Sequence, residues 1–495
     1  MPGRVRPYLV LAVFLAAACG QKAGVGDALP VPTPAAPSAV TAPGSRVLGD
    51  GARPSEQGAG SAKPADPTTG TAGSAPAPAP PGGHRPRPAA GGAEPPGVAA
   101  SAPGSTSAPG VIFGAPPTAS TGPSSAGETV LDRTGVGDRE IVVGVHAPIS
   151  GAAPLPQEFK ADIELYWRWL ADRGGVFGRT VRIIVKDDQF NPSRALQVCR
   201  ELVEVDRVFL LVGIGADQVA ACARYADSVG VPYLSPGGAE NAVAGLSSFF
   251  ALSMTFPQQA PLLAQLATRL ATTKVAVVVT NTPNYDEPFQ AMVGAARQAG
   301  LTIVRTSRIG KQATQSETLA EAGALKASGA QAVMLLAAPL VFLNLATSAQ
   351  SQAYRPVWMG PGMTNGLNPV AEVGCPAIAG ARFLSPFPQL DVIDRFDPDL
   401  RAAARRYNGA EPTDITLVAW GLNKTLHRMV EAAGSDLHRQ GFLAALRSGR
   451  EFASNVFPPL RYSAGRPFGA TQAHLLEADC ANRRFKTTAT FVSSL

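Results

Sequence analysis

The sequence has few aromatic, charged, cysteine and histidine residues for its length. Of 495 residues, 6% are aromatic and 16% are charged, with 5 cysteines and 5 histidines. The formal net charge is only +6, and no basic run is interleaved with aromatic residues, which argues against a nucleic-acid partner. No two cysteines or histidines have metal-ligand spacing, and the sequence contains neither a GxSxG motif nor paired catalytic carboxylates. We therefore predict no metal, no cofactor and no enzymatic activity.

Long hydrophobic runs are also missing, apart from a short one near the N-terminus. Two arginines precede the apolar run Tyr8–Ala18, which is too short to span a bilayer and is typical of a secretory signal peptide. The three alanines before Cys19 resemble a bacterial lipobox, although Leu15 lies four residues before the cysteine instead of three. We predict a signal peptide over residues 1–18 and lipidation of Cys19, which anchors the mature protein outside the cell membrane. Plain secretion, with Cys19 removed, is the alternative.

Residues 19–135 consist largely of Pro, Ala, Gly, Ser and Thr. About half of the 45 prolines lie before residue 130, and Phe113 is the one aromatic residue of this stretch. Such a composition buries too little apolar surface to offset the entropy lost on ordering, so we predict a disordered linker. The linker either holds a folded domain away from the membrane or is a low-complexity segment whose length matters little. The three or four domains that the length suggests are therefore too many.

Residues 136–495 alternate apolar strands with amphipathic helices. The runs IVVGV, VRIIVKDD, VFLLVG, KVAVVVT and AVMLLAA are nearly continuous in apolar residues, which is typical of parallel strands buried on both faces. Asn191 and Pro192 predict the N-cap and first turn of the helix after the second strand. The pattern restarts after Pro257, so we predict an α/β protein with two αβα lobes, each a parallel, doubly wound sheet. A hairpin turn is predicted near Ala481.

One stretch, Val208–Asn241, predicts one wall of a ligand site. It contains a buried strand, a glycine turn, a helix, a second buried strand and a second glycine turn. Both turns follow the carboxyl ends of neighbouring parallel strands, where ligands bind to open α/β sheets.

The order of these elements resembles the type 1 periplasmic binding proteins, in particular the branched-chain amino-acid (Leu/Ile/Val) binding branch that serves ABC importers. The residues that carry the resemblance are PISG (148–151), QEF (157–159), DRGGVFGRTVRIIVKDDQFNPSRA (172–195), VG (212–213), GVPYLSPGG (230–238), NYDEPF (284–289) and MGPG (359–362). The resemblance implies two lobes joined by three crossovers, with the ligand in the cleft between them. Lobe 1 then covers about residues 138–255 and 386–457, and lobe 2 about 256–385 and 458–495. The crossovers fall near Ser253–Pro257, Leu384–Pro388 and Phe457–Tyr462.

The resemblance also makes the cysteines informative. With the strand order 2-1-3-4, right-handed crossovers place the helix of Cys199 beside the helix of Cys222. Cys375 lies late in lobe 2, and Cys480 lies in a terminal segment that the family returns to the same lobe. We predict the disulfides Cys199–Cys222 and Cys375–Cys480, since thiols oxidise outside the cytoplasm. Free buried cysteines that pack as small apolar residues are the alternative.

In amino-acid binders of this family, hydroxyls and backbone N–H groups of two lobe 1 turns hold the ligand carboxylate. An acidic residue of lobe 2 helps to hold the ammonium. The resemblance places candidate ligand-binding residues at Ser150, Asp217, Ser235, Gly237, Ala239, Tyr285, Pro339 and Gly362. Leu155 and Pro156 stand near the place of a further pocket aromatic, and Leu340 adjoins Pro339.

Three of these positions depart from the amino-acid binders. Asp217 falls where relatives carry Ser or Thr, and its carboxylate would repel an anionic ligand group, so capping of the following helix is the favoured interpretation. Ala239 lacks a hydroxyl, and Gly362 stands where the acidic residue belongs. Because an unpaired buried charge is strongly unfavourable, we predict a ligand that is not a standard α-amino acid but a less charged or more apolar small molecule.

The resemblance and the N-terminal segment together indicate a function. We predict a monomeric, extracytoplasmic lipoprotein that captures a small molecule between its lobes and delivers it to an ABC permease in the membrane. The alternative is a ligand-sensing or scaffold lipoprotein with the same fold and no role in transport.

Overall fold

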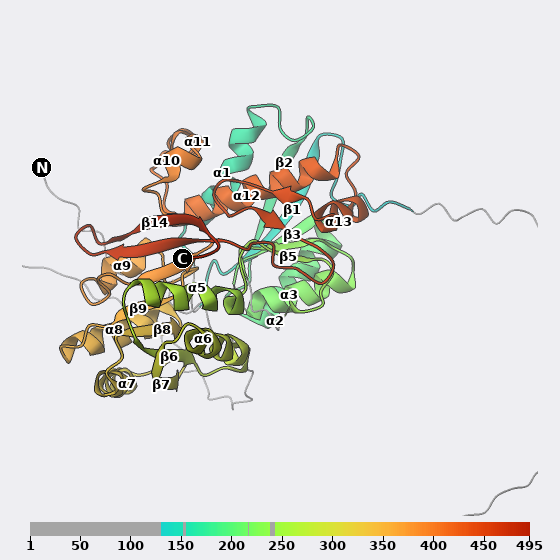
Figure 1. Cartoon of the computed structure of the whole chain (residues 1–495). Helices are drawn as coiled ribbons and strands as arrows, with labels where there is room; N and C mark the ends of the chain where they lie inside the picture. Colours follow the sequence, from blue (N-terminus) through green and yellow to red (C-terminus); the bar gives the residue numbers. More distant parts are fainter. Residues whose placement is uncertain (1–129, 152–154, 216, 238–242) are drawn as a thin grey trace, which may run out of the picture. The chain divides into compact units, whose positions relative to one another are not determined.

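The computed structural model describes residues 130–151, 155–215, 217–237 and 243–495 (Figure 1). These residues fall in a single compact unit that includes residues 127–495. The predicted signal peptide, Cys19 and most of the predicted linker lie outside the described residues. No helix within the described part is long and apolar enough to cross a membrane.

The first large sheet has five strands, all parallel, in the order β2-β1-β3-β4-β5. The order of the first four strands is the predicted one. At the centre of the sheet, Val143 lies opposite both Ile183 and Leu210, and every residue of β3 is buried, which explains the continuous apolar run. The strands are β1 (Glu140–Ala147), β2 (Thr180–Asp187), β3 (Leu210–Gly213), β4 (Tyr233–Ser235) and β5 (Phe249–Ala251).

Helices from two distant parts of the chain accompany this first sheet and complete lobe 1. The early helices are α1 (Phe159–Ala171), α2 (Pro192–Arg200), its π-helical continuation η2 (Glu201–Val205) and α3 (Asp217–Ser228). The later helices are α10 (Ile393–Phe396), α11 (Asp399–Ala403), η4 (Ala404–Asn408), α12 (Asp414–Ala433) and α13 (Arg439–Arg447). The predicted cap of α2 is confirmed, because the Asn191 side chain accepts hydrogen bonds from the backbone of Ser193 and Arg194. α12 packs along α1 (Figure 1). In this contact, Tyr166 of α1 meets Trp420 of α12 edge to face.

The segment that leads into β1 is held on lobe 1. Arg439, at the start of α13, is buried and pairs with Asp132 at 2.8 Å. The same guanidinium donates hydrogen bonds to the backbone carbonyls of Val208 and Phe209, just before β3. The entering chain, α13 and the central sheet are therefore connected through one side chain.

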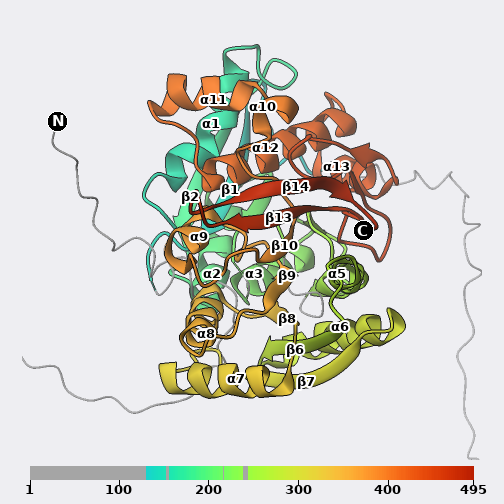
Figure 2. The same cartoon turned by 60° about the vertical axis from the view of Figure 1, so that its left-hand side comes forward.

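The second large sheet has seven strands in the order β14-β13-β10-β9-β8-β6-β7 (Figure 2). Five strands are parallel, as predicted, and the terminal hairpin adds two antiparallel strands beside β10. The turn of this hairpin lies at the predicted place. The strands are β6 (Lys274–Thr280), β7 (Thr302–Ile309), β8 (Ala332–Leu336), β9 (Val357–Pro361), β10 (Arg382–Ser385), β13 (Ala473–Asp479) and β14 (Arg484–Val492).

Helices cover both faces of the second sheet and complete lobe 2. They are α5 (Phe256–Arg269), the short η3 (Pro283–Tyr285), α6 (Asp286–Gln298), α7 (Gln315–Ser328), α8 (Pro339–Ser351) and α9 (Asn368–Gly374). Along β6, Val277 and Val279 join the core that contains α5 and α6, whereas Ala276 and Val278 join the core that contains α7 and α8. Both faces of the strand are buried, so its sequence is apolar throughout.

The chain crosses between the lobes three times, and the third crossing lies later than predicted. A two-stranded sheet of β11 (Glu451–Phe452) and β12 (Leu460–Arg461) follows α13. Beyond it, the Gly469 N–H still donates to the Ala251 carbonyl of β5 at 3.1 Å. Phe468 packs against Phe249 of the same strand, which keeps this segment on lobe 1. The chain therefore crosses between Gly469 and Ala473 instead of near Phe457–Tyr462.

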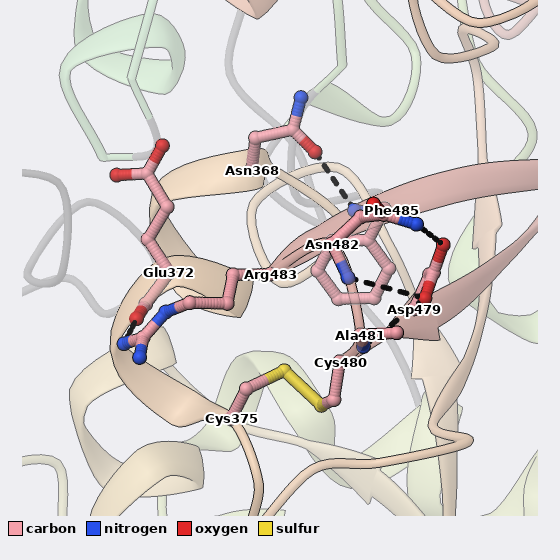
Figure 3. The surroundings of a disulfide bond; sticks show 9 residues. All are labelled: Asn368, Glu372, Cys375, Asp479, Cys480, Ala481, Asn482, Arg483 and Phe485. Atoms are coloured by element: carbon pink, nitrogen blue, oxygen red, sulfur yellow. Dashed lines mark hydrogen bonds between the residues drawn. A yellow bond between two sulfur atoms is a disulfide. The ribbon is translucent and has the colours of Figure 1, made fainter.

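The structure contains both predicted disulfides. Cys199–Cys222 joins α2 to α3, with the Cα atoms 5.9 Å apart. Cys375–Cys480 joins the end of α9 to the β13–β14 turn, with the Cα atoms 5.3 Å apart (Figure 3). Figure 3 also shows Arg483 of that turn donating to the Glu372 carbonyl of α9. The terminal hairpin is thus attached to α9 by a covalent bond and by polar contacts.

Candidate functional site

A cavity of about 200 Å³ lies between the lobes, at the carboxyl ends of both parallel sheets. An engineered cavity of about 150 Å³ holds benzene, so the space suits a small organic molecule. From lobe 1 it is lined by Pro148, Leu155, Phe159, Ile163, Ile214, Gly215, Pro236, Gly237, Ile415, Val418, Ala419 and Leu422. From lobe 2 it is lined by Phe256, Gln259, Thr282, Asn284, Tyr285, Leu336, Ala337, Pro361, Met363, Thr364, Asn365 and Leu367. The remaining lining residues are Ser253, Met254, Leu384, Ser385, Pro386, Phe387, Gln472 and Ala473, on or beside the three crossovers.

The described lining is apolar on most of its surface and carries no charged side chain. None of the described lining residues is Asp, Glu, Lys, Arg or His. Its polar groups are hydroxyls and amides, together with the backbone of the turns after β3 and β4. The described side chains of this lining do not compensate a charged ligand group, because a buried ion requires a partner of opposite charge or several strong hydrogen bonds.

Two amides of the lining have carbonyl oxygens without a partner. Asn365 follows β9 and is 2% exposed, while Gln259 lies in the first turn of α5 and is 6% exposed. Neither Asn365 Oδ1 nor Gln259 Oε1 accepts a hydrogen bond. Their nitrogens are engaged, since Asn365 Nδ2 donates to the Ala337 carbonyl at 3.1 Å and Gln259 Nε2 donates to the Met254 carbonyl at 3.4 Å.

Two of the candidate residues predicted from the sequence line the cavity. Gly237 belongs to the turn after β4, and Tyr285 belongs to the turn after β6. The Tyr285 ring is buried and meets the Phe256 ring edge to face. Leu155, near the predicted place of a pocket aromatic, lines the cavity as well.

Two candidates on lobe 1 shape the turns instead of lining the cavity. Ser235 is buried, and its hydroxyl donates to the Gly237 carbonyl at 2.6 Å, which folds the turn after β4. Ser150 is exposed, and its hydroxyl donates to the Asp187 carboxylate at 2.5 Å. Asp187 also accepts a hydrogen bond from the backbone N–H of Ile149. Burial acts to raise the pKa of Asp187, but these hydrogen bonds outweigh burial, and the pKa is lower than its ordinary value. Both serine hydroxyls therefore make hydrogen bonds that hold their own loops in place.

Two candidates on lobe 2 also lie outside the lining. Pro339 begins α8 and is buried, while the lining is made by the residues just before it, Leu336 and Ala337. Gly362 packs against β10, where its N–H donates to the Leu384 carbonyl at 2.6 Å. A Cβ atom at Gly362 would lie 2.7 Å from the Phe383 Cβ, so this position requires glycine for packing.

The remaining candidates of the first wall are only partly described. Asp217 is the first residue of α3, so it lies at the N-terminal end of the helix that the sequence predicts. Ala239 lies outside the described residues.

Sequence reasoning missed the two lining amides. The resemblance to amino-acid binders implies a ligand contact at Gly362, but the lining residues of this loop are Met363, Thr364 and Asn365. Gln259 follows Pro257 at the start of a helix, and that pattern is explained equally well by helix capping. Neither residue carries a local signal that separates a ligand contact from ordinary loop or helix chemistry.

Three buried side chains linked by hydrogen bonds lie next to the end of β3, which leads into the first turn of the predicted wall. His146 Nδ1 lies 2.8 Å from an Asp188 carboxylate oxygen, and His146 Nε2 lies 2.5 Å from the Tyr233 hydroxyl. Because a carboxylate only accepts, His146 donates from Nδ1 and accepts the Tyr233 proton at Nε2. A Cβ atom at Gly213, the last residue of β3, would overlap the Tyr233 hydroxyl. Glycine at this position allows the three side chains to meet.

The same region contains the one group of potential metal ligands within the described residues. His146, Cys199 and Cys222 have ligand atoms within 4.8 Å of one another. The two cysteines form a disulfide and offer no thiolate, and both His146 nitrogens are hydrogen-bonded. This cluster therefore does not provide a metal site.

A buried carboxyl group connects the lobes at the edge of the cavity. Asp414 of α12 accepts hydrogen bonds from the Asn368 backbone N–H at 2.6 Å and from Asn368 Nδ2 at 3.0 Å, across the lobe boundary. Their chain neighbours Ile415 and Leu367 line the cavity. Burial raises the pKa of Asp414 to about 7, with Glu372 adding to the rise and the Asn368 hydrogen bond opposing it.

Comparison with known proteins places this architecture. The family model described as "Periplasmic binding protein" matches residues 140–481, well over half of the chain. No curated protein matches the chain in sequence.

Three solved structures illustrate the likeness in fold. The ABC transporter solute-binding protein from Rhodopseudomonas palustris BisB5, in complex with 3,4-dihydroxybenzoic acid, is 15% identical over 72% of this chain and 98% of that chain, with a TM-score of 0.61. The fatty acid ABC transporter substrate-binding protein from Thermomonospora curvata is 20% identical over 73% and 94%, with a TM-score of 0.62. An ABC transporter substrate-binding protein from Desulfitobacterium hafniense, in complex with Leu, is 18% identical over 70% and 100%, with a TM-score of 0.59. At such low identities the likeness shows the fold alone.

Proposed function

Because this chain belongs to the periplasmic binding protein family, we propose that it captures a small molecule in the cavity between its lobes and delivers it to an ABC permease. The observation that carries the proposal is the position of the cavity, which meets the carboxyl ends of both sheets and all three crossovers. Closure of the lobes by a hinge motion at those crossovers would enclose a solute. In this proposal, the protein acts as a monomer outside the cytoplasm.

The proposed solute is not a standard α-amino acid. The described lining offers no carboxylate for an ammonium group and no cationic side chain for a carboxylate. Gly362, at the place of the family's acidic residue, packs against β10 instead of facing a ligand. Similar folds are described with leucine, with 3,4-dihydroxybenzoic acid and as fatty-acid transporters, so the fold itself leaves the ligand open.

Calorimetric titration of the full chain with leucine, isoleucine and valine tests this exclusion. We expect no saturable heat from any of the three. A thermal-shift screen of the same protein against aromatic acids, amides, sugars and alcohols is expected to identify a stabilising ligand, because a ligand that binds only the folded state raises the melting temperature. Micromolar binding of leucine would contradict the exclusion, and a screen without any stabilising compound would contradict solute binding.

The proposed membrane anchor is the thiol of Cys19. Replacing it in the full chain (Cys19→Ala) is expected to release the protein from the membrane fraction into the soluble extracytoplasmic fraction. Retention of the variant on the membrane would contradict lipidation at this residue. Genes for a permease and an ATPase beside this one are expected, and their absence would favour the sensing or scaffold role.

A further inference from the structure

Met363 is a flexible side chain that reaches from lobe 2 to lobe 1 within the cavity. It follows β9, is half-buried and lines the cavity. On the facing turn after β4, a Cβ atom at Gly237 would overlap Met363 Cε and would lie 3.2 Å from Met363 Sδ. The end of the methionine therefore fills the space in which a side chain at position 237 would begin.

The glycine of this contact provides space and not conformational freedom. Gly237 does not have the left-handed backbone conformation that favours glycine. The Ser235 hydroxyl donates to the Gly237 carbonyl at 2.6 Å and accepts from the Gly237 N–H at 3.3 Å, so the turn is held by its own hydrogen bonds. The missing Cβ leaves room for the end of Met363 and for the Ser253 hydroxyl, which would lie 2.9 Å from that Cβ.

The loop that carries Met363 is fixed at both of its ends. Before Met363, the Gly362 N–H donates to the Leu384 carbonyl at 2.6 Å. After it, Asn368 donates twice to Asp414 of lobe 1, and its Oδ1 accepts from the Phe485 N–H of β14 at 2.8 Å. Methionine has three rotatable side-chain bonds and adapts to irregular spaces. Between two backbone segments that are held in place, the Met363 side chain is therefore the part that can move.

Resting on the proposed solute-binding function, we propose that Met363 determines the length of the solute by occupying the space between the lobes beside Gly237. The part of the solute that meets Met363 is apolar, because a thioether donates no hydrogen bond and is only a weak acceptor. A longer solute enters this space only when the end of the methionine moves out, and this movement loses its packing against Gly237.

Probes of increasing length test this limit. The full chain and its Met363→Ala variant are titrated calorimetrically with phenylalkanols, phenylalkanoates and phenylalkylamines of one to five methylenes, so that the result does not depend on the charge of the head group. In the parent, we expect the gain in affinity of about fourfold per methylene to stop at a definite length. In Met363→Ala, which removes three heavy atoms, the gain is expected to continue for up to three further methylenes, while the shortest probes bind no more tightly.

Other outcomes separate this inference from the proposed function. An unchanged length limit in folded Met363→Ala would overturn the role of Met363 and leave solute capture intact. A uniform change in affinity at every length would also overturn it, since such a change reports on lobe closure and not on length. Failure of all three series to saturate either protein would overturn the length limit, whereas solute capture is decided separately by the thermal-shift screen.

A double-mutant cycle tests the contact between the lobes without a ligand. In the parent, the methyl group of Gly237→Ala overlaps Met363, and we expect it to favour unfolding by about tenfold in the equilibrium constant, as measured in urea. In the Met363→Ala background the effect is expected to be smaller, because only the approach to Ser253 remains. Leu367→Ala is the matched control background, since Leu367 lines the cavity from the same loop but is not among the nearest neighbours of Gly237. We expect the full tenfold effect there.

A second substitution acts in the opposite direction. Met363→Phe places a stiffer and bulkier side chain in the same space, so the length limit is expected to shorten in all three series. If Met363→Ala does not fold, as judged by its melting transition, Met363→Phe decides alone. An unchanged limit in folded Met363→Phe, or equal effects of Gly237→Ala in the Met363→Ala and Leu367→Ala backgrounds, would overturn the inference.

Discussion

Lobe 1 and lobe 2 face the same cavity but present different chemistry to it. The strands of the first large sheet come from one continuous stretch, residues 140–251, and the turns of lobe 1 bring backbone groups and apolar side chains to the cavity. The strands of lobe 2 come from residues 274–385 and 473–492, and its lining includes the two buried amides. The first sheet is thus built from one continuous stretch, although helices of residues 393–447 complete its lobe, whereas the second sheet is assembled from distant segments and its lobe brings amide side chains to the cavity.

Removal of the disulfides is expected to give the largest difference in stability between the two lobes. Cys199–Cys222 closes a sequence separation of 23 residues within lobe 1, and Cys375–Cys480 closes one of 105 residues in lobe 2. On the chain-entropy account, replacing each pair by alanine lowers the free energy of unfolding by about 3 kcal/mol for the short loop and about 5 kcal/mol for the long one. Urea unfolding of the two double variants measures both values. Equal losses, or a larger loss for the lobe 1 pair, would contradict the expected asymmetry.

Substitution of one glycine tests the rigid support of the first wall. In Gly213→Ala the new methyl group overlaps the Tyr233 hydroxyl and displaces the contact of Tyr233 with His146. Because both side chains are fully buried, we expect a loss of about 3 kcal/mol in the free energy of unfolding, at the upper end for overpacking. Gly294→Ala is the matched control in lobe 2, since a Cβ atom there meets nothing within 4 Å.

Gly294 lies in the interior of α6, so its replacement by alanine is expected to be neutral or to stabilise the protein by up to about 1 kcal/mol. Chemical denaturation of both variants provides the measurement. A Gly213→Ala protein as stable as the parent would show that the buried chain tolerates displacement.

The contact between the lobes predicts a dependence of stability on pH. The pKa of Asp414 is about 7 in the folded protein, above its ordinary value of 3.8. Between those values the folded chain keeps a proton that the unfolded chain releases, so stability falls as the pH rises, by up to about 1.4 kcal/mol per pH unit from this group. In Asp414→Asn this contribution disappears, and unfolding measured from pH 4 to pH 8 is expected to show a flatter profile.

A second buried carboxyl group acts in the same direction and remains in the variant. Burial raises the pKa of Asp162, in α1, to about 6. Part of the fall in stability between pH 4 and pH 6 is therefore expected to persist in Asp414→Asn. The smallest expected effect comes from Glu372→Gln, which removes a neighbouring negative charge and shifts the Asp414 transition slightly to lower pH. An identical slope in Asp414→Asn and the parent would contradict the assignment to Asp414.

Most of the fold could be predicted from the sequence because the sequence patterns that indicate it are local. Continuous apolar runs identify the buried strands, and Asn191 with Pro192 identifies the start of α2. The strand order 2-1-3-4 of lobe 1 was implied by the resemblance to type 1 periplasmic binding proteins, and the structure has this order. The third crossing was misplaced because aromatic packing of Phe468 on β5, a contact between residues more than two hundred positions apart, keeps the chain on lobe 1.

Fewer of the residues that line the cavity could be predicted from the sequence, for a geometric reason. Gly237 and Tyr285 directly follow strand ends, where position along the chain determines position at the sheet edge. Asn365 lies four residues beyond β9, and Gln259 lies on a helix, so their orientation depends on the turn after Gly362 and on the packing of α5. Periodicity and spacing do not encode such directions.

The attachment of the entering chain to lobe 1 has a mechanical consequence. Asp132 is fastened to Arg439, which is itself fixed to the backbone before β3. A pull transmitted through the preceding residues is therefore borne by the body of lobe 1 and does not load lobe 2 or the crossovers. In the proposed closure, the N-terminal segment is therefore held by lobe 1 alone, so tension on that segment does not act across the crossovers.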